Sequence, residues 1–101
     1  MKQIKWGILG TGSIAKAFAE ALQETEGELI AVASTTKQRA LEFSEPYGCE
    51  AIEGHRNLIS LPGIDAIYIA TPHTSHFEFA VECLKQKKAV FCLRHSTANS
   101  K

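Results

Sequence analysis

Short apolar runs alternate with amphipathic segments along most of the chain. Each run is too short for a helix, and each is bounded by polar residues or by glycine or proline, which is typical of a buried strand. Five such runs predict five strands, at residues 4–9, 29–33, 49–52, 66–70 and 89–93.

The segments between these runs have helical spacing. In the first, Ile14, Phe18 and Leu22 recur every four residues and predict an amphipathic helix from Ser13 to about Thr25. A second helix is expected over residues 37–45 and a short one over 57–61. The last begins at a capping box in which Ser75 is the N-cap and the acidic residue lies three positions on.

The resulting order, in which strands and helices alternate, indicates a fold class. Strands that are apolar throughout are buried on both faces, as in parallel sheets covered by helices. We therefore expect an α/β domain over residues 1–101, with a doubly wound, Rossmann-like parallel sheet of about five strands.

Composition narrows the function classes. Of the 101 residues, 45% are apolar, and 11 basic residues balance 11 acidic ones, so neither a nucleic acid nor a membrane is an expected partner. No signal peptide or apolar stretch of membrane-spanning length is seen, which favours a cytoplasmic location. Three separated cysteines are expected to be buried, reduced thiols, and no metal site is predicted.

The first predicted strand leads into the first helix through a glycine-rich turn that fits G-x-G-x-x-G/A. In this context Gly10 permits the tight turn, Gly12 lets a pyrophosphate approach the backbone, and Ala15 keeps the helix close to the strand. The anion would lie on the free amides of the helix N-terminus. The alternative is a turn that binds no ligand. The candidate cofactor-binding residues here are Gly10, Thr11, Gly12, Ser13 and Ile14.

The end of the second strand bears on the choice of cofactor. The acidic residue that commonly binds the ribose of NAD is absent, and Ser34, Thr35 and Lys37 stand there instead. Hydroxyls and a cation suit a 2′-phosphate, so NADP is favoured over NAD. The alternative for Lys37 is a solvated lysine at a helix start.

Three stretches of the chain, residues 5–15, 31–34 and 65–76, resemble the family of glucose-fructose oxidoreductase, inositol dehydrogenase and MocA (Gfo/Idh/MocA), and its dihydrodiol dehydrogenase branch in particular. The resemblance implies an NAD(P)-dependent oxidoreductase acting on a CH–OH group of a sugar, cyclitol or diol. It also implies cofactor contacts after the fourth strand, from Thr71, Pro72, His73 and His76.

The chain departs from that family in three ways. Family members carry Glu-Lys-Pro after the fifth strand, where Arg94 here replaces the lysine as the candidate catalytic residue. An arginine stays protonated and does not exchange a proton at neutral pH. Lys87 stands where a glycine is common, so we expect it in a left-handed conformation. The family's C-terminal domain is also absent from the sequence.

These departures leave alternatives to the oxidoreductase reading. The chain could be a non-catalytic nucleotide-binding or interaction module, or an inactive truncated product. A partner chain or a second copy would then meet it through the uncovered edge of the fifth strand.

Overall fold

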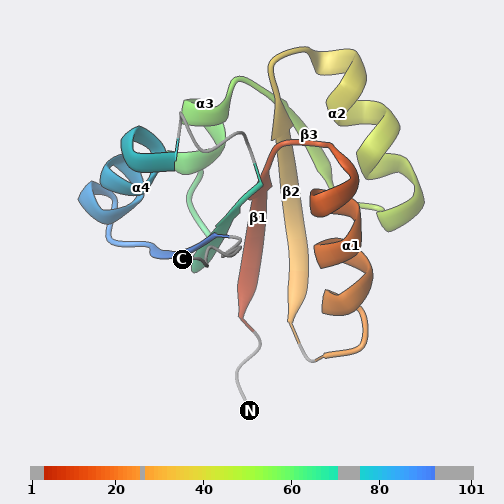
Figure 1. The fold of residues 1–101 in the computed structure, drawn as a ribbon, viewed down its shortest axis with the longest axis horizontal. Helices are drawn as coiled ribbons and strands as arrows, with labels where there is room; N and C mark the ends of the chain where they lie inside the picture. The colour runs from red at the N-terminus through yellow and green to blue at the C-terminus, as the bar shows by residue number, and fades with distance from the viewer. Residues whose placement is uncertain (1–3, 26, 71–75, 93–101) are drawn as a thin grey trace, which may run out of the picture.

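Five parallel strands form a single sheet in the computed structural model, which describes residues 4–25, 27–70 and 76–92. The strand order is β3-β2-β1-β4-β5, with β1 at the centre (Figure 1). This confirms the predicted doubly wound parallel sheet. The strands are β1 (Lys5–Leu9), β2 (Glu28–Ser34), β3 (Glu50–Glu53), β4 (Ala66–Ile69) and β5 (Ala89–Cys92).

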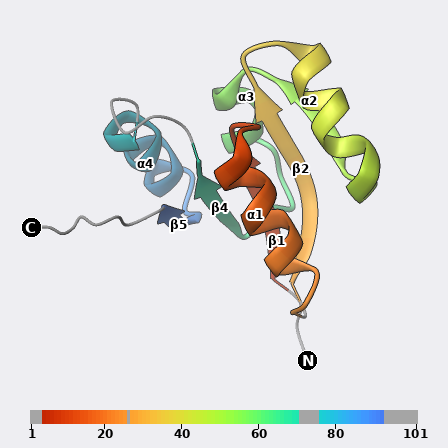
Figure 2. The same ribbon diagram turned by 45° about the vertical axis from the view of Figure 1, so that its right-hand side comes forward.

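The helices cover both faces of this sheet. Those packed against one face are α1 (Ser13–Leu22) and α2 (Lys37–Ser44), the latter continued by the 3₁₀ turn η1 (Glu45–Tyr47). The opposite face is covered by α3 (His55–Ile59) and α4 (His76–Lys85) (Figures 1 and 2). The two pairs lie on opposite faces because the chain moves outward from β1 in one direction and then in the other, with right-handed crossovers each time.

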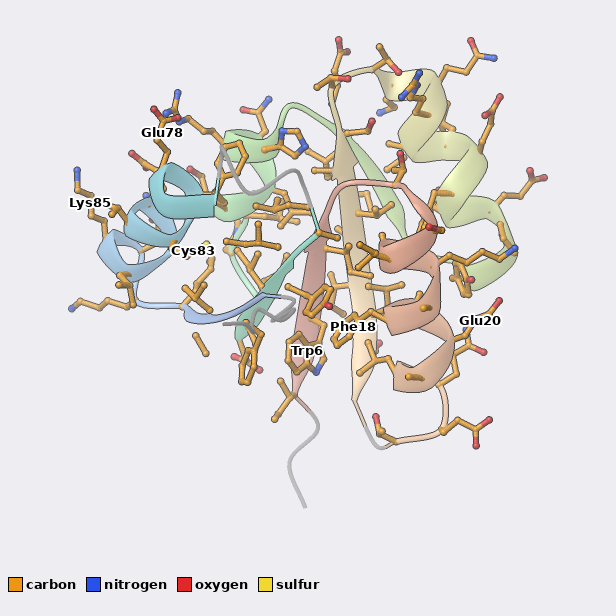
Figure 3. All side chains as sticks on the ribbon, in the orientation of Figure 1. Trp6, Phe18, Glu20, Glu78, Cys83 and Lys85 are labelled. Carbon is orange, nitrogen blue, oxygen red and sulfur yellow. The ribbon has the colours of Figure 1, made fainter. Side chains whose placement is uncertain are left out.

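Side chains alternate along each strand, so each strand contributes to two hydrophobic layers. On β1, Ile8 packs with Val32 beneath α1, whereas Leu9 packs with Ile67 beneath α3 and α4. Ala15 and Ala19 of α1 are fully buried, and their small side chains let the helix lie close to the sheet. Figure 3 shows α4 directing Cys83 toward the sheet while Glu78 and Lys85 point away.

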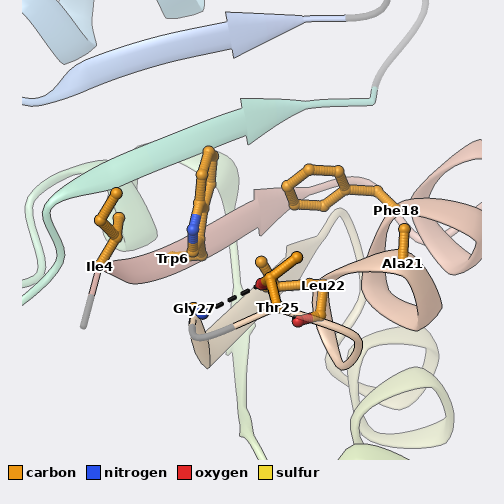
Figure 4. A pocket seen from close by; sticks show the side chains of 7 residues that line it. All are labelled: Ile4, Trp6, Phe18, Ala21, Leu22, Thr25 and Gly27. Atoms are coloured by element: carbon orange, nitrogen blue, oxygen red, sulfur yellow. Dashed lines mark hydrogen bonds between the residues drawn. The ribbon is translucent and has the colours of Figure 1, made fainter.

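Aromatic rings fill the space between α1 and the neighbouring strands. The ring of Phe18 stacks on Tyr68 at 3.9 Å and meets Trp6 edge-on at 5.1 Å between centroids. Phe91 of β5, which is 49% exposed, lies 5.0 Å from Trp6. A shallow apolar groove of about 410 Å³ opens beside these rings (Figure 4). It is lined by Ile4, Trp6, Phe18, Ala21, Leu22, Thr25 and Gly27.

Two helices differ from the prediction by two residues or more, and α2 ends one residue earlier than predicted, at Ser44. The first helix ends at Leu22 rather than near Thr25, because the Thr25 hydroxyl donates to the Leu22 carbonyl at 2.7 Å and turns the chain. The short helix α3 covers His55–Ile59 rather than residues 57–61, because Gly54, at φ 95°, lets the chain enter the helix directly after β3. The strands agree with the prediction to within one residue at each end, apart from the end of the fifth, where residue 93 lies outside the described residues.

The end of α4 has the left-handed residue that the sequence predicted. Lys87 has φ 64°, and its amide donates to the Leu84 carbonyl while that of Lys88 donates to Cys83. This is a Schellman motif, usually made with glycine. Lys88 is itself buried, and its Nζ donates to the carbonyl of Leu61 at 2.9 Å. The motif therefore ties the end of α4 to the loop before β4.

The prediction of buried, reduced thiols is confirmed for Cys83 and only in part for Cys49, which is half-buried; both are free. Burial raises the pKa of each thiol to about 11. The side chain of Cys92 lies outside the described residues.

Within residues 4–25, 27–70 and 76–92, no cluster of three or more histidine, cysteine or acidic side chains is arranged to hold a metal ion. None of the helices in these same ranges is long and apolar enough to span a membrane.

Gly7 is expected to be essential for packing. A Cβ at this position would lie 2.6 Å from Cδ2 of Leu58 and 3.1 Å from Cδ1 of Ile64, both of which are buried. Gly7→Ala should lower the free energy of unfolding by about 1–3 kcal/mol, measured by urea denaturation followed through the sole tryptophan, Trp6. Gly12→Ala is the matched control, since no atom lies within 4 Å of its Cβ. Equal stability of the two variants would contradict this packing argument.

His55 is expected to make stability depend on pH. Its ring packs against Phe79 of α4 at 4.9 Å between centroids, and burial lowers its pKa. The unfolded chain therefore binds the proton more readily than the folded chain does. The contribution of His55 to stability is fully present above its unfolded pKa of about 6.5. This contribution is lost as the pH falls through the lowered pKa of the folded state. Between about pH 8 and pH 5, His55→Gln should lose less stability than the wild type. If the wild type and His55→Gln lost the same stability over this pH range, burial of the His55 ring would not contribute to the pH dependence.

Candidate functional site

The carboxyl ends of three strands meet at one edge of the sheet. The amide of Gly10, just after β1, donates to the Ala33 carbonyl of β2 at 2.8 Å, and the amide of Ala70, just after β4, donates to the Leu9 carbonyl at 2.9 Å. The helices change from one face to the other at this same place, between β1 and β4. Open α/β sheets bind their ligands at such a switch point.

The glycine-rich turn has the predicted strand–turn–helix context. It connects β1 to α1, and Gly10 has φ 109°, a conformation that other residues rarely adopt. Gly12 is the N-cap of α1, and a Cβ built there would meet no atom within 4 Å. The backbone of the turn therefore faces open space, which is what close approach of a pyrophosphate requires.

The N-terminus of α1 is uncapped, in contrast to that of α2. Among the described residues, no side chain accepts a hydrogen bond from the first turn of α1, and that turn contains no acidic residue. In α2 the Thr36 hydroxyl accepts from the Arg39 amide at 3.4 Å. The amides of Ser13 and Ile14, at the positive end of the helix dipole, thus have no side-chain acceptor among the described residues, and the turn fits an anionic group.

The predicted residues at the end of β2 lie next to this turn in the sheet. Ser34 is only 4% exposed, and its carbonyl accepts from the Gly54 amide at 2.8 Å. Thr35 and Lys37 are exposed. The Gly10–Ala33 hydrogen bond holds the start of this segment against the glycine turn.

A groove between α1 and α2 contains residues that the sequence analysis did not single out. It has a volume of about 390 Å³ and extends from the glycine turn to η1. Two cations, Lys16 and Arg39, line it, but Lys37 does not. Only the arrangement of α1 and α2 side by side on one face of the sheet reveals this pairing, because nothing in the spacing of the sequence places these two side chains together. The groove is lined by Thr11, Lys16, Arg39, Glu42, Phe43, Pro46 and Tyr47.

The remaining predicted residues are not placed. Thr71, Pro72, His73 and Arg94 lie outside the described residues, as does the predicted N-cap Ser75. His76 is the first residue of α4, and its side chain is not described. Their roles stay predictions.

A model of an oxidoreductase family with an NAD-binding Rossmann fold, Gfo/Idh/MocA, matches residues 4–93. Among individual proteins, D-xylose 1-dehydrogenase (NADP⁺) of Hypocrea jecorina is 31% identical over 96% of this chain and 28% of its own length. Trans-1,2-dihydrobenzene-1,2-diol dehydrogenase of mouse is 32% identical over 96% of this chain and 30% of its own length.

A solved structure shows the same architecture. KijD10, a 3-ketoreductase from Actinomadura kijaniata in complex with NADP and TDP-benzene, superimposes with a TM-score of 0.86 at 31% identity, over 90% of this chain and 29% of that protein. The chain thus spans less than a third of the length of these relatives. Because the family model matches a range that includes all five strands, the chain belongs to the Gfo/Idh/MocA oxidoreductase family and contains its NAD-binding Rossmann fold.

Proposed function

We propose that this chain binds NADP(H) or NAD(H) on the glycine turn, as the cofactor-binding part of an oxidoreductase that acts on a CH–OH group. The observation that carries the proposal is the N-terminus of α1, whose N-cap Gly12 supplies no side-chain hydrogen bond and which lies beside the carboxyl ends of β1, β2 and β4. Fold and family support it. The bound nicotinamide supplies hydride chemistry, and the protein binds and orients the cofactor.

Each part of the site has a task in this proposal. The amides of Ser13 and Ile14 bind the pyrophosphate, and Gly10 and Gly12 leave room for it. Ser34, the last residue of β2, and Thr35, which follows it, are near the adenosine ribose in this proposal. The segment after β4, which includes His73 and His76, is next to the remainder of the dinucleotide, as the family resemblance implies.

The substrate class is proposed from relatives. One acts on D-xylose and another on a dihydrobenzene diol, as their names state. Both substrates present a secondary or anomeric hydroxyl-bearing carbon, from which a hydride passes to the nicotinamide. We therefore propose a sugar, cyclitol or diol as the substrate of the complete site.

A second candidate function is nucleotide binding without catalysis. It is favoured by Arg94, which stands where the family resemblance places a lysine. A guanidinium stays charged at neutral pH and does not relay a proton as a tuned lysine does. A partner chain or second copy at the β5 edge would complete such a module.

Calorimetric titration of the folded 101-residue chain with NADPH and with NADH should show saturable binding of at least one coenzyme. The expected reason is charge-assisted hydrogen bonding of the pyrophosphate to the amides of α1. Circular dichroism shows that the sample is folded. A folded sample that releases no heat with either coenzyme would refute the proposed function.

Gly12→Ala should separate binding from folding. A methyl group at this position occupies the open space against which the pyrophosphate would lie, so affinity for both coenzymes should fall by about tenfold or more, which is about 1.4 kcal/mol or more. Ser60→Ala, at the exposed C-cap of α3, is the control and should bind as the wild type does. Unchanged affinity in Gly12→Ala would place the pyrophosphate elsewhere.

A further inference from the structure

The open edge of β5 and the flank of α4 beside it form a surface that fits a second copy of this chain. We propose that two copies pair their β5 strands antiparallel about a two-fold axis, which joins their sheets into one and brings their α4 helices together. Because β4 separates β5 from the strand that carries the glycine turn, this interface goes beyond the proposed function and requires no bound coenzyme.

The two edge strands of the sheet differ in how they oppose further pairing. β3 begins and ends with exposed glutamates, Glu50 and Glu53, so two β3 edges would repel each other. β5 contains no charged residue and no proline, and it pairs with β4 without a bulge. Charges, prolines and bulges are the features by which soluble proteins protect an exposed edge. Among the described residues, β5 is therefore the edge strand without such protection.

The backbone of β5 is oriented for pairing at Val90. The amide of Ala89 donates to the carbonyl of Asp65, just before β4, at 3.0 Å. Because successive residues of a strand direct their backbone groups to opposite sides, the N–H and C=O of Val90 point to the open edge. A two-fold axis through Val90 would let the two copies exchange both hydrogen bonds between these residues, as in the hydrogen-bonded pair of an antiparallel ladder.

The same register places a large side chain opposite a small one. With Val90 opposite its counterpart, Phe91 lies opposite Ala89 of the second copy, on the face of the sheet that carries α1. Phe91 is 49% exposed and rests against Trp6 at 5.0 Å between ring centroids, and Ala89 is exposed as well. Directly opposite side chains of an antiparallel pair are in contact. Each copy would thus cover an aromatic ring that the single chain leaves half-exposed.

The flank of α4 that overhangs the β5 edge is apolar at Leu84, which is 64% exposed. Phe79 of α4 contacts His55 of α3, and Cys83 faces the sheet (Figure 3). Successive residues turn by about 100° around a helix, so Leu84 and Phe79 lie on opposite sides of Cys83. Since α3 packs against β1 and β2 whereas α4 packs against β4 and β5, the flank away from α3 is the one beside the open edge.

The spacing of a sheet brings two such flanks together. α4 lies over β4 and β5 (Figure 2), and neighbouring strands are about 4.8 Å apart, so the axes of the two α4 helices would lie about 10 Å apart across the paired edges. Packed helices have interaxial distances of about 8–10 Å. A partner that continues the sheet with its own β5 therefore also supplies a helix at packing distance.

Charge also favours a second copy as the partner. The two-fold axis makes the α4 helices antiparallel, which places the acidic first turn of one, with Glu78, toward the basic last turn of the other, with Lys85. The formal net charge of the chain is zero at pH 7, so two copies approach without net repulsion. One strand edge and one helix flank bury less than the roughly 800 Å² per partner of a standard interface, so we expect a reversible dimer with a dissociation constant in the micromolar range.

Sedimentation velocity of the full chain, from about 1 μM to about 1 mM, tests the interface. The mass should rise with concentration from 11.0 kDa to twice that value. Leu84→Lys should weaken the dimer by about tenfold or more, because it places two ammonium groups at the helix contact. Leu41→Lys is the matched control, since Leu41 is 51% exposed but lies on α2 over the other part of the sheet, and it should dimerise as the wild type does. Circular dichroism shows that each variant is folded.

Two further measurements test the antiparallel arrangement. Lys85→Glu should weaken the dimer by about two- to fivefold, and adding Glu78→Lys should restore it, because the exchange again sets opposite charges across the two-fold axis. Hydrogen exchange of the Val90 amide should slow as the protein concentration rises, whereas that of the Phe91 amide, which faces β4, should not change.

A chain that stays monomeric to about 1 mM would overturn the inference and leave the β5 edge to a different partner chain. A dimer that Leu84→Lys and Leu41→Lys weaken equally, or that neither weakens, would place the interface elsewhere and overturn it too. Oligomers that keep growing with concentration would indicate a contact that does not close, and would contradict the two-fold axis. Each of these outcomes leaves coenzyme binding on the glycine turn to be decided by its own calorimetric test.

Discussion

Backbone pairing on both sides of β1 is the constraint on which the rest of the structure depends. Its carboxyl end is held by hydrogen bonds to β2 on one side and β4 on the other, through Gly10 and Ala70. With both neighbours fixed, the chain must leave the sheet abruptly after Leu9, and a glycine at positive φ permits this. The direction of α1, and hence of its unpaired amides, follows from that turn.

The two ends of the sheet are built for different purposes. Around the beginning of β1 the side chains are large and aromatic, and Trp6, Phe18 and Tyr68 contact one another in the layer beneath α1. At the carboxyl end the residues are small or polar and the backbone is accessible. Residues that stabilise the fold thus lie along β1, whereas residues proposed to bind the ligand lie beyond its carboxyl end. A substitution at Gly7 is therefore expected to affect stability, and one at Gly12 is expected to affect ligand binding.

Much of the fold could be predicted from the sequence because most of the strands contain a short apolar run that ends at a polar residue or a breaker; β3, with glutamate at both ends, is the weakest of them. The glycine turn could also be recognised, since its spacing and its position between a strand and a helix are local properties. Helix boundaries that are set by side-chain hydrogen bonds could not be predicted. An example is the end of α1, where the Thr25 hydroxyl donates to the Leu22 carbonyl. The shared groove of Lys16 and Arg39 could not be predicted either, because it forms only when two helices pack on the same face of the sheet.

The position of β1 also affects how the domain folds. The amide of Lys5 donates to a carboxylate oxygen of Asp65, 60 residues away in the sequence, and β1 pairs with β4 in the same register. During synthesis β1 is made before β4, so its row of hydrogen bonds to β4 forms only after the fourth strand has been made. Contacts this distant in sequence slow folding, because a long loop must close before they are made. Before β4 pairs, the part of the domain that can assemble consists of β1, β2, β3 and the two helices between them. In this part, the edge of β1 that later pairs with β4 is still without a partner strand.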